Sequence, residues 1–109
     1  MAREQLKTLS EPMYYILLAL TSTEYGYGIM QKVEEISSGR VKVGAGTLYA
    51  LLARFTKEQI VYLVSDDGRR KSYALTPKGL EMLKHEYERL NQMVLDGTRY
   101  LESGGSNER

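Results

Sequence analysis

Residues 41–75 limit the choice of fold more than any other part of this chain of 109 residues. The stretch begins with a glycine-rich segment and continues as a predicted short helix. It ends in two predicted strands joined at Asp67 and Gly68, a pair typical of hairpin turns. One apolar stripe predicts that the helix buries one face. The stripe consists of Leu48, Leu51, Leu52 and Phe55. The opposite face is small, hydroxylic or basic, so it can lie on a polyanion.

Two further helices are predicted before this stretch. The first spans about residues 10–21, and Ser10 is its expected N-cap. Apolar residues at helical spacing mark the second helix: Ile29, Val33 and Ile36. Gly39 closes it, because glycine suits the left-handed conformation common at helix ends. Two helices joined by a tight linker to a third helix and a hairpin give the order of a winged helix-turn-helix.

A long helix is predicted over residues 77–102. Thr76 is its N-cap, and Pro77 takes the first helical position, where a missing backbone N–H does no harm. A seam of mainly apolar residues then recurs at spacings of 3 and 4. Its members are Leu80, Leu83, Tyr87, Leu90, Val94, Gly97 and Leu101. The seam packs either on the first helix of the same chain or on a second copy. We favour dimerisation, because the helix is too long for so small a domain to cover.

The distribution of charge, and not its total, indicates a polyanionic partner. The formal net charge is only +1. However, residues 39–57 contain four basic and no acidic side chains, and three basic residues, 69–71, follow Gly68. We interpret this hairpin tip as a wing that reaches the minor groove or flanking phosphates of DNA. An ordinary solvated tip is the alternative, and Asp66 and Asp67 favour it because they offset the charge.

Composition argues against several other classes of protein. The absence of cysteine excludes disulfides and cysteine-ligated zinc, and it fits a reducing cytoplasm. His85, the single histidine, cannot build a multi-histidine metal site, and no spacing places a nucleophile beside a base. The sequence has no phosphate-cradling nucleotide loop, no apolar run near the ~20 residues of a membrane span and no apolar signal core. We therefore expect a cytoplasmic, non-enzymatic protein without cofactor or metal and without membrane contact.

Nine tyrosines and no tryptophan make the aromatic composition unusual. Tyr14 and Tyr15 belong to the first predicted helix, and Tyr87 and Tyr100 belong to the last. If these helices meet at a dimer interface, their rings could line a cavity for a flat apolar or phenolic ligand. Simple interface packing, with hydroxyl groups that reach water or carbonyls, explains them equally well.

Three segments resemble the PadR-like family of transcriptional regulators. They read YGYGIMQKVEE, GAGTLYALLARF and RRKSYALTPKGLEML. The family combines a GY-x-I helix, a G-T-L-Y recognition helix and a wing that ends in Y-x-L-T-x-x-G, and the resemblance covers residues 12–83. It implies a bacterial homodimeric repressor with one added C-terminal dimerisation helix and a pseudo-palindromic operator.

Residue chemistry and this resemblance together identify candidate site residues. The expected DNA contacts are Lys42, Gly46, Thr47, Tyr49, Arg54, Arg69, Arg70, Lys71 and Tyr73. The Tyr73 hydroxyl either binds a phosphate or the ring simply packs. Some relatives bind phenolic or multidrug ligands between the first and last helices. The corresponding positions here are Met13, Tyr15, Tyr87, Leu90 and Met93.

The chain departs from the family pattern at three points. Ala50 stands where the family usually has proline, and Gln59 stands where it usually has glycine. If that position is left-handed, Gln59 makes it costlier by roughly 1 kcal/mol. The chain also lacks a tryptophan for stacking on a ligand ring.

These observations predict a mainly helical α+β protein. We expect a winged helix-turn-helix domain over residues 1–76, a dimerisation helix over residues 77–102 and a disordered tail over residues 103–109. The predicted function is sequence-specific binding of double-stranded DNA as a homodimeric transcriptional regulator, in which a small aromatic effector releases the DNA. The alternative is a winged-helix module that binds another protein and no DNA.

Overall fold

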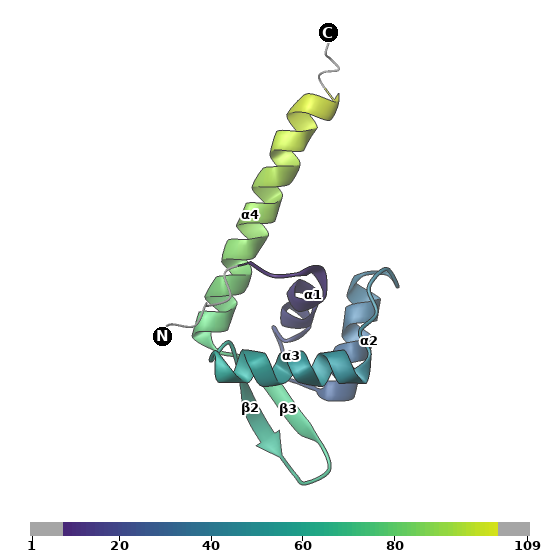
Figure 1. Cartoon of the computed structure of the whole chain (residues 1–109), viewed down its shortest axis with the longest axis vertical. Coiled ribbons are helices and arrows are strands. Elements are labelled where there is room, and N and C mark those ends of the chain that lie inside the picture. Colours follow the sequence, from purple (N-terminus) through teal and green to yellow (C-terminus); the bar gives the residue numbers. More distant parts are fainter. Residues whose placement is uncertain (1–7, 103–109) are drawn as a thin grey trace.

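The computed structural model describes residues 8–102, and it confirms the mainly helical α+β class. The predicted tail at residues 103–109 lies outside the described residues. Seven elements follow one another within residues 8–102, and Figure 1 labels all of them except β1. They are α1 (Glu11–Ala19), β1 (Glu24–Tyr25), α2 (Gly26–Ile36), α3 (Ala45–Lys57), β2 (Val61–Asp66), β3 (Lys71–Leu75) and α4 (Pro77–Glu102).

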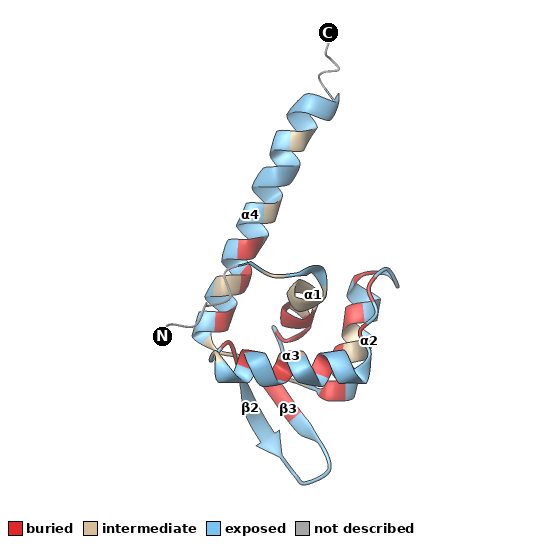
Figure 2. Ribbon diagram, viewed as in Figure 1, coloured by how far each residue is buried: buried red, intermediate tan, exposed pale blue. Residues whose placement is uncertain are grey.

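The core lies where α1, α2 and α3 meet the base of the sheet (Figure 2). Its largest fully buried side chains are Phe55, Ile16, Leu17, Leu20, Ile29, Leu48, Leu52 and Ile60. The stripe predicted on the third helix is therefore buried, except that Leu51 is only half-buried. The stripe predicted on the second helix ends early, because Ile36 at the end of α2 is 43% exposed.

The sheet has three antiparallel strands in the order β1-β3-β2. The hairpin of β2 and β3 was predicted, although the sequence pattern predicts the first strand over residues 60–64 and β2 covers Val61–Asp66. The two-residue strand β1 was predicted as a plain connection. It pairs Glu24 with Tyr73 and Tyr25 with Ser72. This pairing ties the start of α2 to the wing strand β3.

Side-chain and backbone caps fix the helix ends as the sequence predicts. Ser10 Oγ accepts a hydrogen bond from the Met13 N–H at 3.4 Å, and Thr76 Oγ1 accepts one from the Gly79 N–H at 2.9 Å. The end of α2 has two left-handed residues, Ser38 with φ 54° and Gly39 with φ 81°. Serine therefore shares the conformation that was predicted for the glycine alone.

The first three turns of α4 are attached to the domain, and the rest projects away from it (Figure 2). Gly79 lies so close to the Ile60 carbonyl that an added Cβ would overlap it. Glu86 is buried, and it accepts hydrogen bonds from the Leu9 N–H and from the Arg89 guanidinium, each at 2.9 Å. Beyond Leu90 every described residue of α4 except Gly97 is exposed.

Candidate nucleic-acid interface

The face of α3 that points away from the core is open and hydroxylic. Gly46 and Thr47 are exposed in its first turn, and an added Cβ on Gly46 would meet no atom within 4 Å. Tyr49 is 48% exposed one turn further on. Small residues at the start of a helix let its free N–H groups approach phosphate closely. This face therefore suits a nucleic-acid backbone or groove.

Two of the basic residues predicted on and beside α3 have acidic neighbours. Lys42 Nζ lies 3.8 Å from a Glu34 carboxylate oxygen, and both side chains are exposed. Arg54 forms a closer ion pair with Glu58, at 2.9 Å, one helical turn away. Their positive charge is thus partly compensated in the free protein, and an exposed pair such as Lys42 with Glu34 contributes little stability.

The two aspartates at the wing tip build the turn. Asp67 Oδ1 accepts hydrogen bonds from the backbone N–H groups of Arg70 at 2.8 Å and Arg69 at 3.0 Å, and these bonds lower the pKa of its carboxyl. Asp66 Oδ1 accepts one from the Gly68 N–H at 2.9 Å. Gly68 has φ 87°, which a residue with a Cβ rarely adopts. The carboxylates hold the backbone that carries the cations, so their presence does not argue for a merely solvated tip.

The cationic side chains of the wing remain available. Within residues 8–102, the side chains of Arg69 and Lys71 form no hydrogen bond or ion pair. The Arg70 guanidinium lies 4.1 Å above the ring of Tyr25, within the range of a cation–π contact. Strand β1 therefore positions one arginine and leaves the other two cations free.

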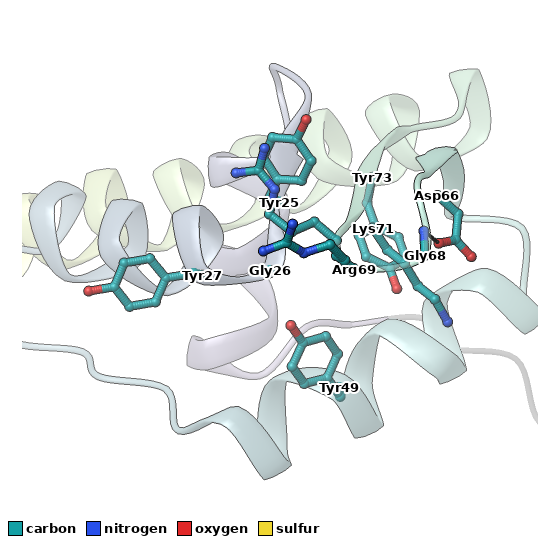
Figure 3. Close-up of a pocket in the computed structure, with 10 residues that line it drawn as sticks. Tyr25, Gly26, Tyr27, Tyr49, Asp66, Gly68, Arg69, Lys71 and Tyr73 are labelled. Atoms are coloured by element: carbon teal, nitrogen blue, oxygen red, sulfur yellow. Dashed lines mark hydrogen bonds between the residues drawn. The ribbon is translucent and has the colours of Figure 1, made fainter.

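A cavity of about 330 Å³, which we call the wing cavity, lies between the wing, the start of α2 and α3. Figure 3 shows that its labelled residues come from these elements and from β1, which contains Tyr25. It is lined by four tyrosines (Tyr25, Tyr27, Tyr49 and Tyr73) and by Arg69, Arg70 and Lys71, among others. Tyr73 was predicted to bind phosphate or to pack. Its ring packs, since only 9% of the residue is exposed.

Sequence patterns did not identify Tyr25 and Gly26 as residues that line the wing cavity. An added Cβ on Gly26 would overlap the Tyr49 hydroxyl, so the glycine leaves room for that side chain. The available signal was the alternation Tyr-Gly-Tyr-Gly at the start of α2. Its meaning depends on the pairing of β1 with β3, which two residues of sequence cannot predict.

The five predicted ligand-binding residues lie on α1 and α4, and their contacts within one chain differ. The Tyr15 hydroxyl accepts a hydrogen bond from Arg40 at 3.1 Å, on the side of the α2–α3 linker. Tyr14 is instead the α1 tyrosine that lies near Tyr87. Burial is the largest cause of the raised pKa of the Tyr14 hydroxyl, and Tyr15, Tyr87 and Glu86 raise this pKa further. Met13 packs at the edge of the core, Leu90 is half-buried, and Met93 lies 3.4 Å from the Arg89 guanidinium.

The described residues contain no group of three or more metal-ligating side chains that could hold an ion. None of the described helices combines the length and the apolar character that a membrane span requires.

Solved structures share this architecture. A transcriptional regulator of Clostridium thermocellum has a TM-score of 0.69 at 20% identity, over 84% of this chain and 90% of that one. A PadR-like transcriptional regulator of Bacillus cereus has a TM-score of 0.67 at 24% identity, with the same two coverages. BpsR of Bordetella bronchiseptica, whose DNA binding is regulated by 6-hydroxynicotinic acid, has a TM-score of 0.65 at 14% identity, over 84% of this chain and 66% of that one. These identities show a common fold.

Two curated relatives are similar in sequence. The chain is 39% identical over 62 residues to an uncharacterised protein encoded in a transposon of Streptomyces fradiae, and the match spans 57% of this chain but only 17% of that protein. It is 30% identical to an uncharacterised protein of Lysinibacillus sphaericus, over 71% of this chain and 77% of the other. The model of the transcriptional regulator PadR-like family matches residues 16–85, which include the helix-turn-helix, the wing and the start of α4. The chain therefore belongs to the PadR-like family of transcriptional regulators, a family that binds DNA and is not enzymatic.

Proposed function

We propose that this regulator is a cytoplasmic homodimeric repressor that binds a pseudo-palindromic operator through α3 and the wing. One observation carries the proposal. α3 and the wing, which carries three cations, lie at one end of the molecule, and the exposed part of α4 projects from the other (Figure 1). One end is therefore available for DNA while the other is available for a second copy.

In this dimer the two copies of α3 enter successive major grooves, about 34 Å apart. Gly46 and Thr47 face the groove, Tyr49 lies on the side of α3 toward the wing, and Lys42 and Arg54 exchange their carboxylate partners for phosphates. Phosphate contacts supply much of the affinity, so binding weakens as salt rises. The wing cations Arg69, Arg70 and Lys71 contact the flanking backbone or the minor groove.

Replacing single cations tests this assignment. Arg69→Ala should weaken binding to duplex DNA and reduce the slope of log K against log salt by about 0.9, the value for one lost phosphate contact. Lys84→Ala removes the same charge from exposed α4 and is the matched control. Equal affinity of both variants and the wild type, measured by fluorescence anisotropy, would contradict a DNA-binding wing.

We further propose that a small aromatic ligand at the α1–α4 interface of the dimer releases DNA by changing the spacing of the two α3 helices. The support is the placement of Met13 and Tyr15 on α1 and of Tyr87, Leu90 and Met93 on α4. The proposal is tested by titrating phenolic compounds and 6-hydroxynicotinic acid into a preformed complex with DNA. Release by one compound, lost in Leu90→Ala, supports the site, whereas no release across the panel counts against it.

A further inference from the structure

The wing cavity contains a hydroxyl group that the fold leaves without a partner. The Tyr73 ring is packed, yet its hydroxyl forms no hydrogen bond with any residue from 8 to 102. No fully buried side-chain oxygen or nitrogen in this range lacks a partner, so the Tyr73 oxygen must reach the cavity surface. Burial raises the pKa of this hydroxyl, and Tyr49 and Asp66 raise it further. The group therefore keeps its proton and can donate a hydrogen bond.

A second hydroxyl faces the same space from the recognition helix. Figure 3 shows the hydroxyl groups of Tyr49 and Tyr73 directed into the region between α3 and the wing. Neither hydroxyl has a hydrogen-bond partner among the described residues. The end of the Tyr49 side chain lies against Gly26, whose missing Cβ leaves room for it. Two donors from different elements thus converge on one cavity.

The charge around the cavity favours an anion. Arg69, Arg70 and Lys71 line it, against one carboxylate, that of Asp66. The Asp66 carboxylate already accepts the Gly68 N–H at 2.9 Å as part of the turn. The Arg70 guanidinium is positioned by its contact with the Tyr25 ring, at 4.1 Å, whereas the side chains of Arg69 and Lys71 have no hydrogen bond or ion pair among residues 8–102. The cavity therefore combines fixed hydroxyl donors with a fixed positive charge.

We infer that the wing cavity seats one phosphodiester of the DNA backbone, bound by the hydroxyl groups of Tyr73 and Tyr49 and by the Arg70 guanidinium that Tyr25 positions. The inference rests on the proposed function. A sugar–phosphate strand separates the major groove that α3 enters from the minor groove that the wing approaches, and the cavity lies between these two elements. Because the Tyr73 ring is fixed by packing, this phosphate contact would set the register of α3 on the duplex.

Removal of single hydroxyl groups tests the seat. Tyr73→Phe and, separately, Tyr49→Phe should each weaken binding to the duplex that the wild type prefers by roughly tenfold, as expected for a hydrogen bond to a charged group. No charge is lost, so the salt slope should stay that of the wild type. Tyr62→Phe, on the exposed strand β2 and outside the cavity, is the matched control and should bind as the wild type does.

A scan with methylphosphonate linkages, which are uncharged, locates the phosphate. Several positions per half-site should weaken wild-type binding, and at one of them the same substitution should cost much less in Tyr73→Phe. Two results would overturn the phosphate site while leaving DNA binding intact. One is that both Phe variants bind with the affinity of the wild type. The other is that every methylphosphonate weakens binding of Tyr73→Phe as much as it weakens binding of the wild type. Failure of the wild type to bind any duplex would overturn the proposed function and the seat together.

Discussion

Gln59 adopts a backbone conformation that is less favourable for glutamine than for glycine. Its φ is 62°, in the left-handed region that favours glycine. The backbone geometry is that of a Schellman helix end, with the Ile60 N–H bonded to the Phe55 carbonyl at 2.8 Å and the Gln59 N–H to the Thr56 carbonyl at 3.0 Å. The left-handed joint considered for this position from the family pattern is therefore confirmed.

Gln59→Gly should stabilise the protein by about 1 kcal/mol, because glycine adopts this conformation without the steric cost of a Cβ. Urea unfolding followed by circular dichroism measures the difference. Gln59→Ala keeps the Cβ and is the control, so it should give no comparable gain. Equal stability of Gln59→Gly and Gln59→Ala would show that the conformation costs little here.

Residue patterns predicted the caps, the turn and the exposed face of α3, because each depends on a few neighbouring side chains. They failed where the cause is distant in the chain. Tyr25 meets Arg70 only because β1 pairs with β3, and Tyr15 meets Arg40 only because α1 packs beside the α2–α3 linker. Neither contact leaves a periodic trace in the sequence.

At the scale of elements, Glu86 joins α4 to the segment that precedes α1. Its carboxylate accepts the Arg89 guanidinium and the Leu9 N–H, and the hydrogen bonds from Arg89 are the largest reason why its pKa lies below the ordinary 4.5. A group whose pKa is lower in the folded than in the unfolded protein stabilises the fold above its unfolded pKa. That contribution is lost as the pH falls through the folded pKa.

Glu86→Gln should therefore make stability less dependent on pH below about 4.5, since the amide cannot take up a proton. Urea unfolding at a series of pH values between neutral and acid measures this. Glu88→Gln, an exposed neighbour on the same helix, should lose stability with the same pH profile as the wild type. Parallel profiles for Glu86→Gln and Glu88→Gln would refute the role of Glu86.

For the whole molecule, the length of α4 determines what remains uncovered. Its 26 residues extend about 39 Å at 1.5 Å per residue. The sequence left two readings of the seam open, packing on the same chain or on a second copy, and within one chain only the first part of the seam is packed. Leu83 is buried on the domain of its own chain, whereas Val94 is 63% and Leu101 84% exposed. The sequence could not predict the residue at which α4 leaves the domain of its own chain, because the heptad repeat continues unchanged past that residue.

If the exposed part of α4 pairs with a second copy, Val94→Glu should convert a dimer into a monomer that keeps its helix content. Two buried carboxylates facing one another would be costly. Sedimentation velocity measures the mass, and circular dichroism measures the helix. Asn91→Glu, one turn away and off the seam, is the control and should remain dimeric. A monomeric wild type at micromolar concentration would exclude this interface.

The central claim is sequence-specific DNA binding by the end of the molecule formed by α3 and the wing. It is tested most directly by fluorescence anisotropy with the duplex upstream of the protein's own coding sequence and with a scrambled duplex of equal length, at several salt concentrations. Our account predicts tight, preferential binding to the upstream duplex that weakens steadily as salt rises. Equal and weak binding to both duplexes, or no binding even at low salt, would contradict it.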